Sequence, residues 1–291
     1  MKVSGFTIVR NAIKFDYPVV ESIKSILPLC DEMIVAVGKS EDETLTLIQN
    51  INDPKIKIIQ TVWDDTLREG GRVLALETDK ALEAVAHDSD WCFYIQADEV
   101  IHEKFHDQIR KAMQLWKDEP KVEGLLFKYI HFYGSYDYVA DSRKWYKNEI
   151  RIIRNGINVK SYRDAQGFRI DGTRKLNVKP IDAFVYHYGW VKPPEAQQAK
   201  QKSFHKMWHD ENWMKQNIPE VDAFDYSGID SLATFQGRHP LTMLSRISKT
   251  NWKFNVDPSK KSWSLKMRFL MWIEKTTGWR IGEYKNYKIL N

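Results

Sequence analysis

The sequence is poor in cysteine. Cys30 and Cys92 are the two cysteines among its 291 residues, and both lie in apolar stretches. Reduced core thiols fit this placement better than a disulfide framework, and the spacing of a zinc site does not occur. The sequence therefore predicts a fold that depends on an ordinary hydrophobic core.

Long apolar runs are also missing. No stretch reaches the roughly eighteen consecutive apolar residues that a membrane-spanning helix requires. The first residues, Met1 to Phe6, pass into a short apolar run without the hydrophobic region and cleavage site of a secretory signal. We expect a cytoplasmic protein, either soluble or peripheral on the inner face of the membrane.

Glycine-rich nucleotide-binding loops are absent too. The chain has neither a G-x-G-x-x-G turn after its first expected strand nor a phosphate-binding P-loop. Dehydrogenases of the dinucleotide-binding type and P-loop enzymes depend on these loops. Both classes are therefore disfavoured.

Aromatic and basic residues are abundant instead. The chain contains 11 Trp, 13 Tyr and 13 Phe, and its net charge is +5. From His239 to Asn291, eleven basic residues face three acidic ones, so the remainder of the chain is slightly acidic. A basic tail with interleaved tryptophans is consistent with an anionic lipid surface, with a polyanionic acceptor, or with an ordinary solvated helix face.

Short apolar runs alternate with helical patterns through the first part of the chain. The runs cover residues 5–9, 33–37, 56–59 and 91–95, and helical spacing of apolar residues separates them. Strands that alternate with helices predict a parallel sheet with right-handed crossovers. The expected fold class is therefore α/β, Rossmann-like.

The pattern changes in the second part. Residues 149–154 and 157–162 flank Asn155-Gly156, which predicts a two-residue hairpin. Further expected elements are strands at 124–132 and 183–187 and helices at 193–214 and 262–276. These elements predict a mixed, mostly parallel sheet flanked by helices, with a catalytic domain over 1–190 and a mainly helical, basic C-terminal extension over 191–291.

Polar residues follow each of the first four strands. Ligands bind beyond the carboxyl ends of the strands in such sheets, so these residues are the first candidates for a site. Several carboxylates at one edge would repel a diphosphate, so a divalent cation, Mg²⁺ or Mn²⁺, is the expected partner. The residues are Arg10 and Asn11, the segment from Gly38 to Asp42, Asp64 and Asp65, and the segment from Gln96 to Glu99.

Together, these segments resemble the family 2 glycosyltransferases of the GT-A fold, in particular the bacterial members that decorate lipopolysaccharide and related glycans. The resemblance covers residues 1 to about 190. It implies an inverting transfer of a hexose or related sugar from a nucleotide-diphosphate sugar of the UDP, GDP or dTDP type to a glycan or lipid-linked acceptor. The motifs that carry it are Thr7-Ile8-Val9-Arg10-Asn11, Ser40-Glu41-Asp42-Glu43-Thr44, Trp63-Asp64-Asp65 and the stretch from Trp91 to Glu99.

The resemblance also implies roles for single residues. Asp98 matches the second carboxylate of the family's D-x-D motif and would bind the metal, with Glu99 beside it and His187 completing the metal site. The first position of that motif is Gln96 here, which removes one charge but can still hydrogen-bond a ribose. The residues expected to bind the donor nucleotide are Arg10, Asn11, Asp42, Asp65, Arg72, Gln96 and Ala97.

An inverting transfer needs a general base near the acceptor hydroxyl. Asp164 is the first candidate because it lies after the expected hairpin and before His187, with Asp141 and Glu149 as alternatives. Arg151 and Arg154 are expected to stabilise the leaving diphosphate as fixed positive charges. Any of these carboxylates can instead form an ordinary ion pair with a nearby arginine.

Other interpretations remain open from the sequence. Asp98 and Glu99 can simply cap a helix beginning near His102, and His187 can be an ordinary core histidine. A sugar-phosphate nucleotidyltransferase shares a similar sheet and metal, although its glycine-rich N-terminal loop is missing here. A polyanion- or nucleic-acid-binding protein is a third hypothesis, but it leaves the acidic strand ends unexplained, so nucleic acid is not the expected partner. The apolar side of the helix at 262–276 either contacts a membrane or covers the catalytic core.

Overall fold

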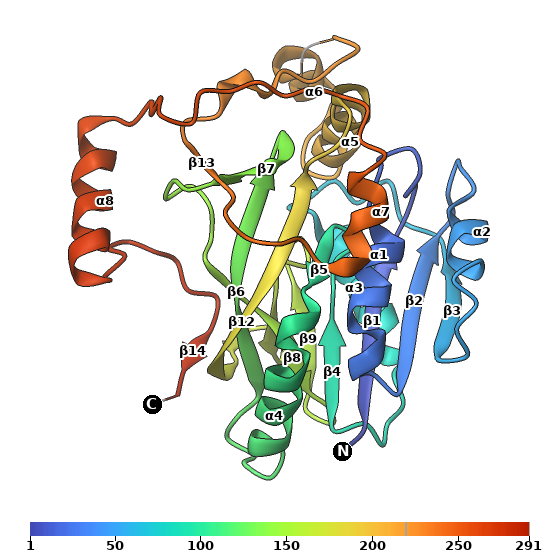
Figure 1. Cartoon of the computed structure of the whole chain (residues 1–291). Helices are drawn as coiled ribbons and strands as arrows, with labels where there is room; N and C mark the ends of the chain where they lie inside the picture. The colour runs from blue at the N-terminus through green and yellow to red at the C-terminus, as the bar shows by residue number, and fades with distance from the viewer. Residues whose placement is uncertain (219, 291) are drawn as a thin grey trace.

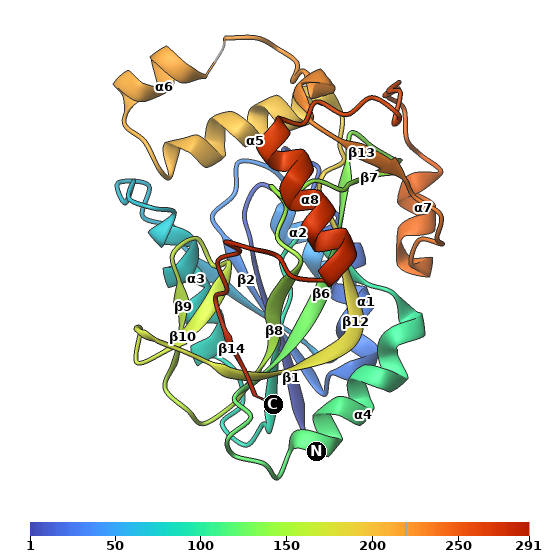
Figure 2. The same cartoon turned by 90° about the vertical axis from the view of Figure 1, so that its left-hand side faces the viewer.

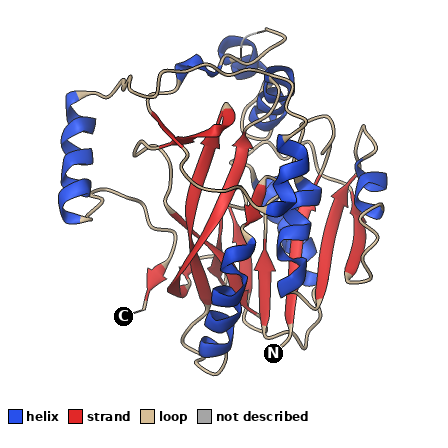
Figure 3. Ribbon diagram, in the orientation of Figure 1, coloured by secondary structure: helices blue, strands red, loops and turns tan. Residues whose placement is uncertain are grey.

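An eleven-stranded mixed sheet with helices on both faces forms the body of the protein in the computed structural model, which describes residues 1–218 and 220–290 (Figures 1 and 3). The strands of this sheet are β1 (Val3–Val9), β2 (Glu32–Gly38), β3 (Ile56–Thr61), β4 (Trp91–Tyr94), β5 (Glu99–Ile101), β6 (Gly124–Tyr133), β7 (Ser135–Ala140), β8 (Asn148–Arg154), β12 (Asn177–Trp190), β13 (Leu232–Thr234) and β14 (Lys288–Ile289). A small second sheet contains β9 (Val159–Tyr162), β10 (Gly167–Ile170) and β11 (Arg174–Lys175). The α-helices of the described residues are α1 (Val19–Ile26), α2 (Thr44–Gln49), α3 (Arg72–Glu83), α4 (His106–Trp116), α5 (Pro194–Lys206), α6 (Glu211–Asn217), α7 (Leu244–Ile247) and α8 (Leu265–Thr277).

The parallel part of the sheet has the order β4-β1-β2-β3, as the alternation of strands and helices predicts. Every residue of β1 and β2 is buried, which explains their continuous apolar sequences. Successive side chains of β2 enter different cores: Met33 and Val35 pack with residues of α1 and α4, whereas Ile34 packs with residues of α3. The two helical layers therefore cover opposite faces of these strands.

The rest of the large sheet is mainly antiparallel, and the mixed α/β class is confirmed. The predicted hairpin across Asn155-Gly156 is wrong. β8 pairs with β4 and β6 in the large sheet, whereas β9 pairs with β10 in the small one. Gly156 still makes a turn, with φ of 73°, but the buried side chains of β8 draw it into the large sheet and away from β9.

Strand β12 is much longer than the expected strand at 183–187. It runs parallel to β6 and antiparallel to β5, and in the second pairing His187 lies opposite Glu99. This register places the end of β12 beside the segment that follows β4. The sheet thereby brings His187 next to Asp98, although 88 positions separate them in the chain.

The C-terminal part is not only helical. The helix expected at 193–214 is divided into α5 and α6, while β13 pairs with β7 and β14 pairs with β12. The expected boundary near Val191 falls between β12 and α5, but segments beyond it return to the sheet. Among the described residues, no helix has the length and apolar character needed to cross a membrane.

Candidate active site

A cavity of about 920 Å³ lies beyond the carboxyl ends of β1 and β4, and residues of α5 line it as well. Figure 1 shows where these elements lie in the fold. Eight of the candidate residues from the sequence line this cavity. They are Arg10, Asn11, Asp65, Gln96, Ala97, Asp98, Asp164 and His187. Chain segments from strand ends, a loop and a helix therefore converge here, as expected for a ligand site in such a sheet.

Asp98 and His187 face each other at the edge of this cavity. The Oδ1 atom of Asp98 lies 3.8 Å from Nε2 of His187, and the backbone N–H of Tyr188 donates to the carbonyl of Asp98. Gly189 makes this approach feasible, because a Cβ there would lie 2.6 Å from His187 Nε2 and 2.8 Å from Asp98 Oδ2. The space beside both side chains stays open only with glycine at this position.

The tautomer of His187 follows from its neighbour His131. His131 Nε2 lies 2.7 Å from the carbonyl oxygen of Tyr146, so this nitrogen carries the proton and donates. His131 Nδ1 is then an acceptor, and His187 donates its Nδ1–H to it across 3.1 Å. Burial lowers the pKa of His131 to about 3 and that of His187 to about 4, so both rings are neutral near pH 7. The lone pair of His187 Nε2 therefore faces the Asp98 carboxylate.

Lys200 of α5 supplies a positive charge to the same carboxylate. Its Nζ donates to Asp98 Oδ2 across 3.0 Å and to the carbonyl of Gly189 across 2.9 Å. Burial alone would raise the pKa of Asp98, but the positive charges of Lys200 and other neighbours hold it below its usual range. Asp98 is therefore ionised at neutral pH.

The donor set fits a divalent cation that a substrate completes. Two acceptors, Asp98 Oδ1 and His187 Nε2, face each other with no proton between them, which favours a cation in that position. Mg²⁺ and Mn²⁺ commonly take one or two protein ligands and complete their shell with phosphate oxygens and water. The described residues contain no group of three His, Cys, Asp or Glu side chains that could hold a metal, so they do not form a closed protein cage.

Glu99 does not fit the metal-binding role expected for it. It accepts from Arg151 Nε and Nη2, each across 2.7 Å, and from the hydroxyl of Tyr129 and the backbone N–H of Gln96. Both Glu99 and Arg151 are fully buried and neither lines the cavity. The pair supports the floor of the site, so Arg151 does not fit the expected contact with the diphosphate either.

Asp98 and Glu99 do not cap the helix near His102. The ring of His102 itself accepts from the backbone N–H of Lys104 at the start of that helical segment. Asp98 instead lines the cavity, and Glu99 is the first residue of β5. The capping interpretation is therefore wrong.

Asp164 lines the cavity on the side of α3. Burial raises the pKa of its carboxyl, which makes the ionised form a stronger base. Gly71, with φ of 68°, allows this approach, since a Cβ there would lie 2.7 Å from Cβ of Asp164. The alternative base Asp141 contacts Lys261 and Ser231 and lies outside the cavity lining. The other alternative, Glu149, is buried outside it.

Some of the expected nucleotide-binding residues line the cavity and others do not. Arg10 and Asp65 form a bidentate ion pair at the cavity wall, in which Nη2 of Arg10 lies 3.0 Å from Oδ2 of Asp65. Asn11 accepts from the backbone N–H of Glu41 across 2.7 Å. Two expected residues, Asp42 and Arg72, do not line the cavity. Asp42 accepts from the backbone N–H groups of Lys14 and Thr44, and Arg72 is exposed at the start of α3.

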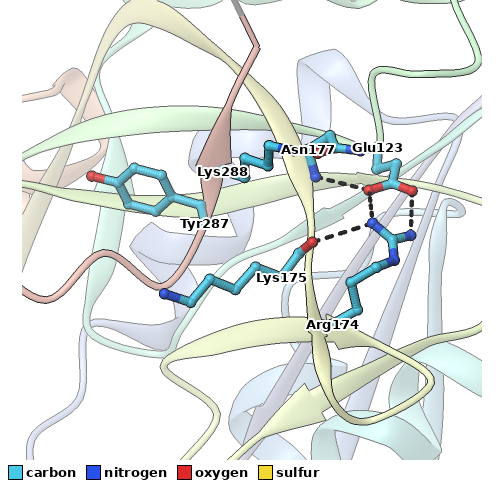
Figure 4. A pocket seen from close by; sticks show the side chains of 6 residues that line it. All are labelled: Glu123, Arg174, Lys175, Asn177, Tyr287 and Lys288. Atoms are coloured by element: carbon cyan, nitrogen blue, oxygen red, sulfur yellow. Dashed lines mark hydrogen bonds and ion pairs between the residues drawn. The ribbon is translucent and has the colours of Figure 1, made fainter.

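A second cavity lies between the small sheet and the C-terminal strand β14 (Figure 4). Glu123 in this cavity binds Arg174 with both carboxylate oxygens and accepts from the backbone N–H of Asn177. Lys175 is directed to the carbonyl of Lys285. Because these polar groups satisfy one another, the cavity at the strand ends remains the candidate active site.

Two residues that contact His187 or Asp98 had no signal in the sequence that would have identified them. Lys200 belongs to a basic helix, and a charge on such a helix is usually solvated. His131 lies inside β6, where a single histidine is normally a core residue. Their functions depend on which side chains the folded sheet places within hydrogen-bond distance.

No protein-family model and no curated protein sequence matches this chain. Parts of its structure are similar to solved proteins at low sequence identity. S. aureus TarS in complex with UDP has 17% identity and a TM-score of 0.40, over 70% of this chain and 64% of that one. The 4-diphosphocytidyl-2C-methyl-D-erythritol synthase of Anaerococcus prevotii has 12% identity and a TM-score of 0.33, over 53% and 71%.

Glucosyl-3-phosphoglycerate synthase of Mycobacterium tuberculosis, solved with Mn²⁺, UDP and phosphoglyceric acid, has 18% identity and a TM-score of 0.30, over 45% of this chain and 43% of that one. The chain spans less than two thirds of the length of the TarS structure. Similarity at this level does not define an activity, which depends on the side chains of the site.

Proposed function

We propose that this protein is a glycosyltransferase that transfers a sugar from a nucleotide-diphosphate donor to a glycan or lipid-linked acceptor. The observation that carries the proposal is the pair of facing acceptors, Asp98 Oδ1 and His187 Nε2, 3.8 Å apart at the edge of a cavity of about 920 Å³. Lys200 adds a fixed positive charge beside them. A diphosphate carries the complementary negative charge and the oxygen ligands that the site lacks.

Asp98 and His187 would hold the divalent cation, which supplies positive charge to the donor diphosphate and its leaving oxygen. Lys200 is placed to contact the same phosphates from α5, because its Nζ already reaches the Asp98 carboxylate. Arg10, Asn11, Asp65 and Gln96 line the wall nearest β1 and β4 and would contact the nucleotide. The choice among UDP, GDP and dTDP depends on this wall.

Asp164 would act as the general base. Its carboxylate accepts the proton of the acceptor hydroxyl while that oxygen forms a bond to the anomeric carbon of the sugar. The bond from this carbon to the diphosphate oxygen breaks at the same time, and the nucleoside diphosphate leaves with the electron pair. The raised pKa of Asp164 suits this role, and attack opposite the leaving group inverts the anomeric configuration.

The test is a panel of nucleotide sugars with Mg²⁺ or Mn²⁺, measuring the shift in melting temperature and the slow hydrolysis of each donor. The Asp98→Asn variant is compared with Asp182→Asn, an exposed carboxylate paired with Lys128. We expect one donor to raise the melting temperature only with metal, an effect that Asp98→Asn loses and Asp182→Asn keeps.

The hydrolysis product separates the transferase from the alternative enzyme class. A transferase releases a nucleoside diphosphate, whereas a sugar-phosphate nucleotidyltransferase forms pyrophosphate from a nucleoside triphosphate. Metal-dependent stabilisation by a nucleoside triphosphate together with pyrophosphate release would overturn the proposal. Identical responses of Asp98→Asn and the wild type would also contradict it.

A further inference from the structure

Helix α8 lies along one side of the molecule, apart from the helices that cover the sheet (Figures 1 and 2). It has no buried residue. Its ends are nevertheless well defined: the Ser264 hydroxyl accepts from the backbone N–H of Met267, and Gly278 ends the helix with φ of 71°. The helix is therefore a complete element that places no side chain fully in the hydrophobic core.

The outward side of α8 is apolar and aromatic. Leu265, Phe269 and Trp272 are 84%, 60% and 61% exposed, and their spacing places them on one face of the helix. Phe269 and Trp272 stack at 6.2 Å, and Trp279, 65% exposed, follows the end of the helix. The expectation that the apolar side of this helix covers the catalytic core is thus wrong for these residues. Clustered exposed apolar side chains usually mark a binding surface.

A charged contact fixes the orientation of this face. Glu274, on the inward side of α8, binds Arg143 and Lys147 of the body, and Arg280 lies 3.5 Å from the same carboxylate. The side chains of Arg143, Arg280 and Glu274 are only 8%, 7% and 10% exposed. The body therefore holds α8 with Leu265, Phe269 and Trp272 directed outward.

The exposed charges of α8 all have one sign. Glu274 is the one acidic residue of the helix, and it is turned toward the body. Lys266, Arg268 and Lys275 are exposed, and among the described residues none of the three takes part in an ion pair. Exposed aromatic and aliphatic side chains beside unpaired cations are the pattern of a helix that lies in a membrane interface.

We propose that α8 docks on the surface of a bilayer that contains anionic lipid. Leu265, Phe269 and Trp272 enter the region of the headgroups, and Lys266, Arg268 and Lys275 contact the lipid phosphates. A convex helix with long flexible cations suits a deformable lipid surface better than a shaped protein pocket. This proposal does not depend on the proposed function, because no residue of α8 lines the candidate active site.

The test is flotation of the intact protein with vesicles of phosphatidylcholine alone or mixed with phosphatidylglycerol. The face variant carries Leu265→Ser, Phe269→Ser and Trp272→Ser, and the control carries Leu115→Ser and Leu241→Ser, which replace exposed leucines on other elements. We expect the wild type and the control to float with the mixed vesicles only. The face variant should bind the mixed vesicles at least about tenfold more weakly.

Circular dichroism and the melting temperature of each variant separate a loss of binding from a loss of folding. A wild type that stays at the bottom of the gradient with mixed vesicles, or a folded face variant that floats like the wild type, would overturn the proposal. Light scattering without lipid tests the other occupant, a second copy of the chain. A dimer that the face variant abolishes would assign this surface to self-association and also overturn it.

Discussion

Helices α5 and α8 are both thirteen residues long, both carry more basic than acidic residues and both follow β12 in the chain, yet they have opposite environments. α5 forms a wall of the candidate active site and delivers Lys200 to the buried Asp98. α8 buries no residue and directs aromatic side chains outward. Basic composition is the same in both. The difference lies in their neighbours. The buried carboxylate of Asp98, between β4 and β5, lies within hydrogen-bond distance of Lys200 in α5.

Replacing one lysine in each helix tests this comparison most strongly. In Lys200→Met, Asp98 loses its cationic partner, and we expect donor turnover to fall about 100-fold because one fixed charge at the diphosphate is lost. Lys275→Met in α8 should leave turnover unchanged. Steady-state kinetics with the donor identified in the panel provide the measurement. Equal losses of turnover in the two variants would contradict the inference that α5, and not α8, contributes a charge to the active site.

A substitution at a residue that supports His187 should weaken metal binding at the site and leave membrane binding by α8 unchanged. His131→Phe removes the acceptor that orients His187 Nδ1–H, so the Nε2 lone pair is no longer fixed. Losses of such supporting contacts typically lower metal affinity about 10- to 100-fold. We expect weaker Mn²⁺ binding in the presence of the nucleoside diphosphate, measured by calorimetry, with vesicle flotation unchanged. Metal affinity equal to that of the wild type would show that His131 only packs.

The segment after α8 differs from α8 itself, because it returns to the core. Asn286 is buried against Gly167 and lies near Glu149, whose pKa burial raises to about 8 from an ordinary 4.5. Below pH about 4.5 the Glu149 carboxyl is protonated in the folded and the unfolded chain. Between that pH and about 8, mainly the unfolded state ionises, so stability falls as pH rises.

Glu149→Gln should remove this pH dependence. We expect the wild type to lose on the order of 3 kcal/mol relative to the variant between pH 5 and pH 8. Urea unfolding of both proteins at the two pH values gives the difference. Parallel changes in the free energy of unfolding of the two proteins would show that Glu149 is ionised in the folded state.

The smallest effect is expected on the exposed face of α8. Phe269→Ser should change the free energy of unfolding by no more than about 0.5 kcal/mol, because this ring is 60% exposed on a helix without buried residues. Phe168→Ser, in the core of the same protein, should cost several times more, about 3 kcal/mol or above. Chemical unfolding of both variants measures this contrast. A large loss for Phe269→Ser would mean that α8 contributes to the core.

The alternation of apolar runs and helical patterns predicted the parallel strands β1 to β4 from sequence alone. It also predicted that Arg10, Asp65, Gln96 and Asp98 would meet, because the carboxyl ends of parallel strands lie at one edge of a sheet. For β1, β2 and β4 the predictions succeed because strands buried on both faces require mainly apolar sequence, so charged residues lie at or beyond their ends.

Tertiary structure alone decided the rest. Adjacent residues Asp98 and Glu99 differ in role because one borders the cavity and the other meets the buried guanidinium of Arg151. Lys200 joins the site from a helix about a hundred residues away, and β8 pairs with β4 and β6 instead of β9. Local sequence determines which residues become strands and helices, but a buried charge is stabilised by whichever partner the folded chain brings within hydrogen-bond distance.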